Sequence, residues 1–312
     1  MRILIVKLYP SFELLNALPT VHRLRREFNA EIHWVVHEQG VELVSCFDDI
    51  QRIIVYPEDE LKHENRAVFR KSLHQETYDL VVDLQGNMQS ALVCKSARKK
   101  KNTDVLGPSF QTEGACFMYT AVTGIRNRDR HPVDEYMDVL RYLDFPTVPV
   151  TFPLRFPMPF IARKITSSYI VCALDIEQNK YQLSEKFWTE VIRHLNCPVV
   201  LIGSRSSEFL SDAIESFSID LPIYNFVNQI NLAEQGGLMQ AAEMVIANNL
   251  LSIHMSAYVG APTIGMLRSK KSFRMHPSIS SCTILENPQI EPKFVIQECV
   301  RMREKCAEVI SF

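Results

Sequence analysis

The chain has 312 residues, of which 46% are apolar and 22% are charged. This balance is typical of a soluble globular protein and excludes a disordered chain. The length suffices for two ordinary domains. The formal net charge is -2, so charge gives no general case for binding nucleic acid.

Neither a leader peptide nor a membrane span is expected. Arg2 and Lys7 flank the apolar run at the N-terminus and leave no h-region, and no apolar run is as long as a membrane span. We therefore expect a cytoplasmic protein. The eight cysteines are scattered, without a Cys-x-x-Cys pair or a Cys/His cluster at zinc spacing. They predict buried reduced thiols rather than a metal site or disulfides.

Strands and helices are predicted to alternate through the first half of the chain. The predicted strands are Arg2–Lys7, Ala30–His37, Ile50–Tyr56, Asp79–Leu84 and Asp104–Leu106. The predicted helices are Leu14–Glu27, Val41–Phe47, Arg66–Gln75, Ser90–Lys101 (which ends in a basic run) and His131–Leu143. Alternation on this scale predicts βαβ units and a parallel sheet.

A proline-rich stretch, Thr147–Phe160, marks a domain boundary, because proline interrupts regular elements. A second alternating series follows it. Its predicted strands are Tyr169–Ala173, Pro198–Ile202, Ile223–Phe226, Met244–Ala247 and Thr263–Leu267, and its predicted helices are Ser184–Leu195, Ser206–Phe217, Leu232–Ala242, Ser252–Val259 and Pro292–Ile310. The fold class is therefore α/β, with two facing Rossmann-like domains, residues 1–155 and 156–312, a ligand cleft between them and a closing C-terminal helix.

The stretch Val245–Leu267 is typical of a ligand-binding loop in an open α/β sheet. An apolar strand is followed by two asparagines, by His254 on a short helix, by Gly-Ala-Pro-Thr and by a second strand. Ligands bind outside the carboxyl ends of such strands, where asparagine side chains and backbone N–H groups face a phosphate or sugar. A lone histidine among apolar residues is more often a core residue, and this alternative stays open.

The loop between the first strand and the first helix carries Glu13 near the helix N-terminus. A carboxylate there is favoured by the helix dipole, so a plain structural acid is one interpretation and a general base facing the cleft is the other. The chain contains no GxGxxG, P-loop, GxSxG or HExxH motif. Dinucleotide oxidoreductases, P-loop NTPases, common serine hydrolases and zinc proteases therefore lose support.

Three further groups of residues are candidates for binding. Lys180 follows a strand and has the charge to neutralise a diphosphate. The loop Gly203–Glu208 has the composition of a ribose or phosphate loop, or of an ordinary helix N-cap. The basic residues comprise the run Arg98–Lys101 and the cluster of Arg126, Arg128 and Arg130, which form either a solvated face or a site for a phosphorylated or membrane-surface acceptor.

Several segments together resemble those of one known family. They are RILIVK and LLNALPTVHRLR at the start, YDLVVDLQGNMQSALV (Tyr78–Val93, the most specific match), HPVDEYMDVLRYLDFP (His131–Pro146), LIGSRSSE, INLAEQGGLMQAAEMVIANN and HMSAYVGAPTIGML. In this order, and over nearly the whole chain, they resemble glycosyltransferase family 9, the ADP-heptose:lipopolysaccharide heptosyltransferases. The resemblance implies the GT-B fold.

The resemblance also implies an inverting sugar transfer without a bound metal or cofactor. ADP-L-glycero-D-manno-heptose is the implied donor, bound mainly by residues 156–312. The implied acceptor is a Kdo or heptose hydroxyl of a lipid A–core saccharide at the inner membrane surface, bound by residues 1–155. No nucleic acid partner is implied, and the oligomeric state stays open.

Individual residues are assigned by position in the family's motifs. Glu13 takes the place of the aspartate proposed as the base, and Phe12 replaces a glycine before it. The donor loop, usually Asp-Thr-Gly-x-x-His, reads Asn249-Leu250-Leu251-Ser252-Ile253-His254. The predicted donor-binding residues are Lys180, Glu208, Asn249, Ser252 and His254, and the predicted acceptor-binding residues are Lys7, Arg126, Arg128 and Arg130.

These replacements account for a shortage of glycine, with 10 residues against about 22 expected from average usage. They leave an alternative function open, a non-catalytic family member that uses the same fold as a binding or assembly protein. A nucleotide-sugar epimerase or another GT-B relative is a third and weaker hypothesis, because the match at Tyr78–Val93 favours family 9.

Overall fold

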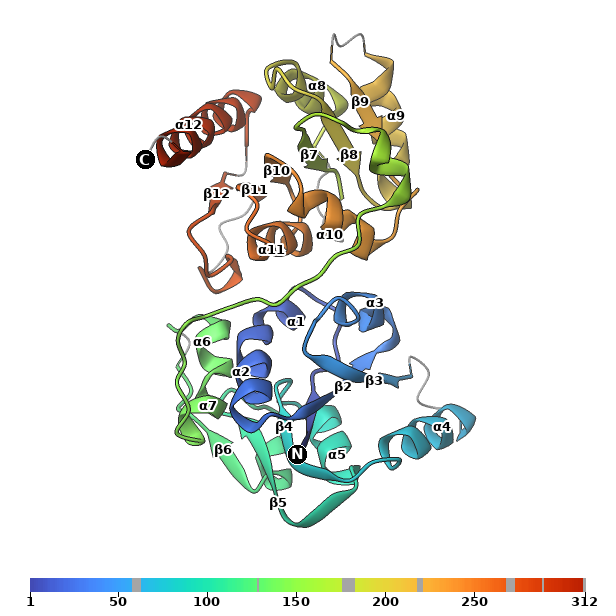
Figure 1. Cartoon of the computed structure of the whole chain (residues 1–312), viewed down its shortest axis with the longest axis vertical. Helices are drawn as coiled ribbons and strands as arrows, with labels where there is room; N and C mark the ends of the chain where they lie inside the picture. The colour runs from blue at the N-terminus through green and yellow to red at the C-terminus, as the bar shows by residue number, and fades with distance from the viewer. Residues whose placement is uncertain are drawn as a thin grey trace. The chain divides into compact units, whose positions relative to one another are not determined.

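Short β-branched runs give each half of the chain a six-stranded parallel sheet (Figure 1). The structure is a computed structural model that describes residues 1–57, 63–127, 129–175, 183–217, 221–267, 273–287 and 289–310. The chain divides into two units, Met1–Arg155 (unit 1) and Phe156–Phe312 (unit 2).

The sheet of unit 1 has the strand order β3-β2-β1-β4-β5-β6, with every pair parallel. Its strands are β1 (Arg2–Val6), β2 (Glu31–His37), β3 (Ile50–Tyr56), β4 (Tyr78–Asp83), β5 (Lys99–Pro108) and β6 (Ala121–Thr123). The central strands are apolar on both sides, as expected for a parallel sheet covered by helices on both faces.

Unit 1 has seven α-helices among its described residues. They are α1 (Glu13–Asn16), α2 (Leu18–Phe28), α3 (Val41–Val44), α4 (His63–Leu73), α5 (Met88–Ser96), α6 (Pro132–Tyr136) and α7 (Asp138–Tyr142), with short 3-10 helices η1 (Glu38–Gly40) and η2 (Ala115–Met118). Leu4 and Val6 pack in one core with apolar residues of α4 and α5. The alternate residues Ile3 and Ile5 are also fully buried, so helices cover both faces of the sheet.

The sheet of unit 2 repeats this topology, with the order β12-β11-β10-β7-β8-β9 and parallel pairs throughout. Its strands are β7 (Ile170–Ala173), β8 (Val199–Ile202), β9 (Ile223–Asn225), β10 (Met244–Ala247), β11 (Thr263–Leu267) and β12 (Cys282–Glu286). Its helices are α8 (Glu185–Arg193), α9 (Glu208–Ser216), α10 (Leu232–Gln240), α11 (Leu250–Tyr258) and α12 (Pro292–Ile310), with 3-10 helices η3 (Phe160–Lys164), η4 (Arg205–Ser207) and η5 (Phe273–Met275).

The core of unit 2 is built from the inner faces of its helices and strands. Trp188 of α8 is fully buried in it, together with Ile246 of β10 and Val295 of α12. The predicted N-cap of α8 is confirmed, because the Ser184 side chain accepts a hydrogen bond from the backbone N–H of Phe187 (3.2 Å). The terminal helix α12 packs on α8 within this unit.

The predicted elements match the structure best where the pattern is simple. The bounds of β10, β11 and α12 are those predicted from the sequence. The strands β6 and β12 were missed. The helix predicted over Ser90–Lys101 was wrong at its end, because α5 stops at Ser96 and the basic residues Lys99–Lys101 begin strand β5.

Two helices predicted as continuous are each divided. The first breaks between α1 and α2 at Ala17, where ψ is -17° and Pro19 cannot donate a backbone hydrogen bond. The second breaks between α6 and α7 at Met137, where ψ is -8° and the backbone tightens locally.

Candidate functional site

The candidate catalytic site of unit 1 lies where its strand order reverses. From β1 the chain proceeds to β2 and β3 on one side of the sheet, whereas β4, β5 and β6 lie on the other. Val6 pairs with Asp83 at the carboxyl ends of β1 and β4, so the loops that follow leave in different directions. Such a reversal point is where open α/β sheets bind ligands.

A buried lysine and a half-exposed glutamate form an ion pair at this point. The Nζ of Lys7 lies 3.0 Å from Oε2 of Glu13, and the exposed fractions of the two side chains are 2% and 47%. The same ammonium donates a hydrogen bond to the carbonyl oxygen of Leu84 after β4 (3.3 Å). It also lies 5.1 Å from the ring centroid of Tyr136 on α6. One end of Glu13 is thus held by the protein while part of it faces solvent.

The surroundings of Lys7 keep it protonated. Burial alone would lower the pKa of Lys7, but the interactions with Tyr136 and Glu13 outweigh burial and raise it above its ordinary value. Burial raises the pKa of Tyr136 to about 12, against the opposing charge of Lys7. At neutral pH the cluster therefore contains a cationic lysine, a neutral tyrosine and the Glu13 carboxyl.

Lys7 was predicted to contact the acceptor, and this contact stays a prediction. In the structure its ammonium contacts Glu13, Leu84 and Tyr136, and 2% of the side chain is exposed. In this position Lys7 is the counter-charge of Glu13. Phe12, at the family's glycine position, has right-handed helical angles (φ -55°, ψ -20°), so this backbone position needs no glycine.

A turn after β4 supports the loop that carries Glu13. Asp83 is fully buried, and its carboxylate accepts hydrogen bonds from Ser90 Oγ (2.7 Å), Tyr119 Oη (2.7 Å), Gln85 N (2.7 Å) and Gly86 N (2.9 Å). Burial raises the pKa of Asp83, although these hydrogen bonds oppose the change. Gly86 has a φ of +79°, a left-handed conformation that favours glycine.

Gln85 connects this turn to the first loop. Its side-chain oxygen accepts hydrogen bonds from the backbone N–H groups of Leu8 (3.3 Å) and Tyr9 (3.4 Å). This turn belongs to the segment Tyr78–Val93, which is the most specific family match in the sequence. No role was predicted for its residues. Their role in the structure is to position the loop between β1 and α1.

Unit 2 has an equivalent reversal point between β7 and β10, with a network built around Asp175. The Asp175 carboxylate accepts hydrogen bonds from Ser204 N (2.8 Å), Ser204 Oγ (2.9 Å) and Ser207 Oγ (2.7 Å). It thereby fixes the loop after β8 to the end of β7. Sequence reasoning missed Asp175, although an acid directly after an apolar strand is a signal that could have identified it.

The two asparagines after β10 complete the network. The Asn249 side chain caps α11 by accepting from Ser252 N (2.8 Å), and its Nδ2 donates to Ser252 Oγ (2.9 Å) and to the Asp175 carbonyl (3.1 Å). Asn248, in the amide orientation that satisfies its hydrogen bonds, donates to the Ala173 carbonyl (3.1 Å). Asn249 and Ser252 thus lie at the predicted donor loop, where their side chains bind each other; their contact with a donor stays a prediction.

His254 is placed differently from the prediction. It is fully buried in the middle of α11, and its Nδ1 lies 2.7 Å from the carbonyl oxygen of Leu250 in the preceding turn. This burial is also what the alternative of a core histidine describes. Its contact with a donor stays a prediction.

The other predicted donor residues lie apart from this cluster or outside the described residues. Glu208 begins α9, and its Oε1 accepts a hydrogen bond from Asn228 Nδ2 (2.8 Å); its contact with a donor stays a prediction. Lys180 lies outside the described residues.

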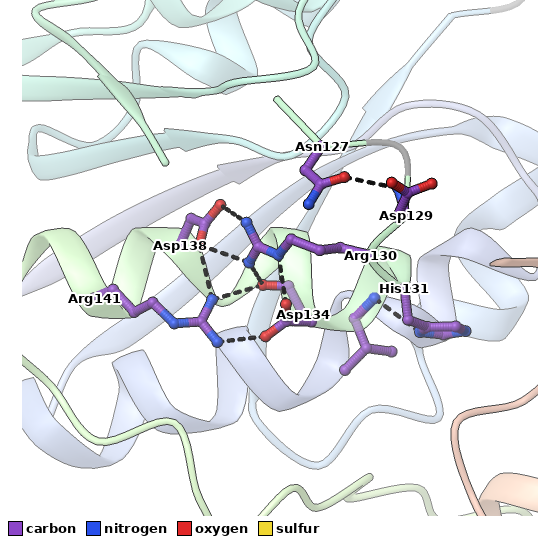
Figure 2. Close-up of polar contacts among 8 residues, drawn as sticks. Asn127, Asp129, Arg130, His131, Asp134, Asp138 and Arg141 are labelled. Atoms are coloured by element: carbon purple, nitrogen blue, oxygen red, sulfur yellow. Dashed lines mark hydrogen bonds and ion pairs between the residues drawn. The ribbon is translucent and has the colours of Figure 1, made fainter. Parts of the chain in front are cut away.

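The predicted acceptor arginines divide into three cases. Arg126 is exposed, and Arg128 lies outside the described residues. Arg130 is held by two aspartates (Figure 2): its guanidinium donates to Asp134 Oδ2 (2.5 Å), to both carboxylate oxygens of Asp138 (2.8 and 2.9 Å) and to the Asp134 carbonyl (2.8 Å). Arg141 also binds both aspartates.

The Arg130 cluster fastens the segment after β6 to α6 and α7. Asp138 is buried, and a Cβ on Gly124 would lie 1.9 Å from its Oδ2, so only glycine fits there. Interactions with Asp138 and Asp134 outweigh burial and raise the pKa of Arg130. The guanidinium of Arg130 binds these partners in the structure, and its contact with an acceptor stays a prediction.

The basic run that follows α5 lies at the opposite edge of the sheet from Glu13. Lys99 pairs with Tyr78 at the start of β4, and its Nζ donates to the carbonyl oxygens of Cys94, Lys95 and Ala97 at the end of α5. Lys100 forms an ion pair with Asp79 (2.5 Å). These lysines therefore stabilise a helix C-terminus and a strand end.

No group of three or more His, Cys, Asp and Glu side chains in the described ranges could hold a metal ion. Within the same ranges, no helix is long and apolar enough to cross a membrane.

Comparisons with known proteins agree with this architecture. A family model described as glycosyltransferase family 9 (heptosyltransferase) matches residues 66–303. No curated protein matches the sequence.

Three solved structures share the fold. E. coli heptosyltransferase WaaC with ADP has a TM-score of 0.81 and 19% identity, over 97% of this chain and 100% of that chain. E. coli ADP-heptose lps heptosyltransferase II has a TM-score of 0.80 and 17% identity, over 97% and 98%. A family 9 glycosyl transferase from Veillonella parvula has a TM-score of 0.82 and 14% identity, over 96% of each chain. With the family match across most of its length, the chain belongs to glycosyltransferase family 9 (heptosyltransferase) and is a glycosyltransferase with the GT-B fold.

Proposed function

We propose that this glycosyltransferase transfers a heptose, with inversion, from an ADP-sugar to a hydroxyl of a lipid A–core saccharide. The observation that carries the proposal is the Lys7–Glu13 pair at the reversal point of unit 1. It presents a half-exposed carboxylate held by a buried cation at 3.0 Å, on the loop where a family 9 chain carries its base. General bases must combine such fixation with access to the substrate.

The chemistry follows from that carboxylate. Glu13 removes the proton from the acceptor hydroxyl as the hydroxyl oxygen attacks the anomeric carbon of the donor. The bond between that carbon and the diphosphate oxygen breaks, and ADP leaves with the electron pair. Because the nucleophile enters on the face opposite to ADP, the anomeric configuration inverts. Lys7 stays protonated throughout and keeps the carboxylate oriented.

The donor assignment is supported by the second reversal point. The loop after β10 leads into the N-terminus of α11, a helix of nine residues, and helix N-termini favour phosphate groups. Asp175 and the two serines that bind it hold the neighbouring loop after β8 in place. The structural relative WaaC was solved with ADP, and we extend that nucleotide to this chain as part of the proposal.

The proposal is tested by incubating the full chain with ADP-heptose and Kdo₂-lipid A and measuring release of ADP together with the anomeric configuration of the product. The expected result is acceptor-dependent release of ADP and an inverted linkage. Release from neither this acceptor nor its heptosylated form would overturn the proposed substrates.

A thermal-shift series with ADP-, GDP- and UDP-sugars tests the nucleotide separately. A ligand present at 100 times its dissociation constant stabilises a protein by about 2.7 kcal/mol, so the correct nucleotide gives the largest shift. A larger shift with a GDP- or UDP-sugar would replace ADP in the proposal and leave the role of Glu13 unchanged.

A further inference from the structure

A groove between α4 and α5 is a cavity that the proposed chemistry does not use. Its volume is about 1140 Å³, and it is lined by the end of β3 and by one face each of α4 and α5. In Figure 1, α4 lies at the outer side of unit 1, beyond β3. All of the groove's lining residues belong to unit 1.

Three exposed basic side chains of α4 line this groove. They are Arg66, Arg70 and Lys71, and Arg66 and Arg70 are four residues apart, which places them on the same helical face. None of the three forms an ion pair with another residue that the structure describes. These exposed positive charges complement an anionic ligand.

The remainder of the groove is largely apolar. Tyr56 and Phe69 pack edge to face at its base, with ring centroids 5.0 Å apart. Leu92 on α5 lines the opposite wall with 51% of its surface exposed. An exposed apolar wall facing exposed guanidinium groups matches a ligand that is both anionic and hydrophobic.

Hydrogen bonds join this groove to the loop that carries Glu13. Gln89 lines the groove, and its Nε2 donates to Tyr56 Oη (3.3 Å). The other atom of the same amide, Oε1, accepts a hydrogen bond from Tyr9 Oη (3.0 Å). Tyr9 lies four residues before Glu13, in the loop between β1 and α1. A molecule in the groove thus lies next to the loop that presents the base.

We propose that the α4–α5 groove binds the phosphorylated, acylated end of the lipid-linked acceptor while that acceptor remains in a membrane surface. Arg66, Arg70 and Lys71 bind the phosphate, and the wall around Leu92 contacts the first carbons of the acyl chains. The inference rests on the proposed function, because the acceptor is taken to be a phosphoglycolipid. A soluble anion and an acidic protein segment are competing occupants, and the experiment separates them.

Vesicle sedimentation with the full chain tests this inference without donor or turnover. The probes are phosphatidylcholine vesicles with and without phosphatidic acid. The groove variant is the double substitution Arg66→Gln/Arg70→Gln. The matched control is Lys186→Gln/Arg193→Gln, which removes the same charge from exposed positions on helix α8 of unit 2. A third variant, Leu92→Gln, changes only the apolar wall.

The wild type is expected to sediment only with the vesicles that contain phosphatidic acid. Each basic side chain near an anionic surface contributes a factor of about five to binding, so the groove variant should bind roughly 25-fold more weakly. Leu92→Gln should also bind more weakly, whereas the control variant should bind like the wild type. Far-ultraviolet circular dichroism and thermal unfolding establish that each variant is folded.

Four results would overturn the inference. They are no vesicle binding by the wild type, equal loss in the groove and control variants, unchanged binding of Leu92→Gln, and displacement by inorganic phosphate at the concentration of the lipid phosphate. The last would assign the groove to a free anion. Vesicle binding without ADP release would contradict only the proposed function, and ADP release without groove-dependent binding would contradict only this inference.

Discussion

The two reversal points of the molecule share a topology and differ in chemistry. In unit 1 a buried cation holds a half-exposed carboxylate, Lys7 and Glu13. In unit 2 the carboxylate of Asp175 accepts hydrogen bonds from two serines, and the asparagines after β10 bind their own loop. In our proposal the first arrangement keeps a base available to substrate, whereas the polar groups of the second fix the shape of the loops after β8 and β10.

This difference shows why position in a fold does not by itself identify a catalytic residue. Asp83 ends β4 and Asp175 follows β7, and both are bound by groups of the protein. Glu13 differs because it pairs with a buried ammonium while 47% of its side chain is exposed.

Among the variants that keep Glu13, the largest effect is expected from Lys7→Met. Removal of the buried ammonium frees Glu13 from its fixed position, and a displacement of about 1 Å at a reacting group can lower turnover roughly 100-fold. The measurement is the rate of ADP release. Lys100→Met is the control, because Lys100 also pairs with a carboxylate, that of Asp79, at the far edge of the same sheet. Equal losses in both variants would contradict a special role for Lys7.

The two buried or partly buried aspartates should differ in their contribution to stability. Asp83→Asn places an amide N–H₂ against donors at a fully buried site, so we expect a loss of about 2–4 kcal/mol in the free energy of unfolding. Asp175 is less buried, and Asp175→Asn should cost about 1 kcal/mol. Urea unfolding of both variants measures the difference. A larger loss for Asp175→Asn would reverse the proposed contrast.

A smaller effect is expected at the cap of α11. Asn249→Ala removes the hydrogen bond to Ser252 N and should cost about 1 kcal/mol of unfolding free energy, whereas Asn249→Asp retains a good cap and should change it by less than about 0.5 kcal/mol. Thermal and urea unfolding test both variants. If Asn249→Ala were as stable as the wild type, the cap would not explain the placement of Asn249.

The smallest effect concerns alkaline pH, where no loss of activity is expected from the Lys7 cluster. The pKa of Lys7 is raised because Tyr136 and Glu13 outweigh burial, and burial raises the pKa of Tyr136 to about 12. Neither group loses its proton below about pH 10, near the ordinary lysine value. The pH–rate profile should therefore show no alkaline limb from these groups. An alkaline limb that Lys7→Arg shifts to higher pH would contradict this assignment.

The sequence predicted elements well where local pattern and tertiary context agree. The strand Met244–Ala247 is uniformly apolar and buried, and its bounds were predicted correctly. The strand Ala121–Thr123 was missed because its three residues are too few for a periodic pattern. Lys99–Lys101 were assigned to a helix because a charge run shows no strand period, although pairing with β4 places them in β5.

A residue of the candidate site could be predicted where its position in a strand-to-helix connection was enough to identify it. Glu13 was identified in this way, from its loop and from the family motif. The burial of Lys7 and His254, and the commitment of Arg130 to Asp134 and Asp138, depend on contacts between segments far apart in the sequence. Tyr136 left no signal in the sequence, because its contact with Lys7 exists only after α6 packs against α1 and α2.

The central claim is that the Glu13 carboxyl performs the proton transfer while unit 2 binds the donor. The most direct measurement compares Glu13→Gln with the wild type for both ADP-heptose binding by calorimetry and acceptor-dependent ADP release, with Glu27→Gln as a surface control in the same unit. The account predicts donor binding within about twofold of the wild type and turnover lowered by roughly 10²- to 10⁴-fold, the usual contribution of a general base. Turnover within about tenfold of the wild type would contradict it.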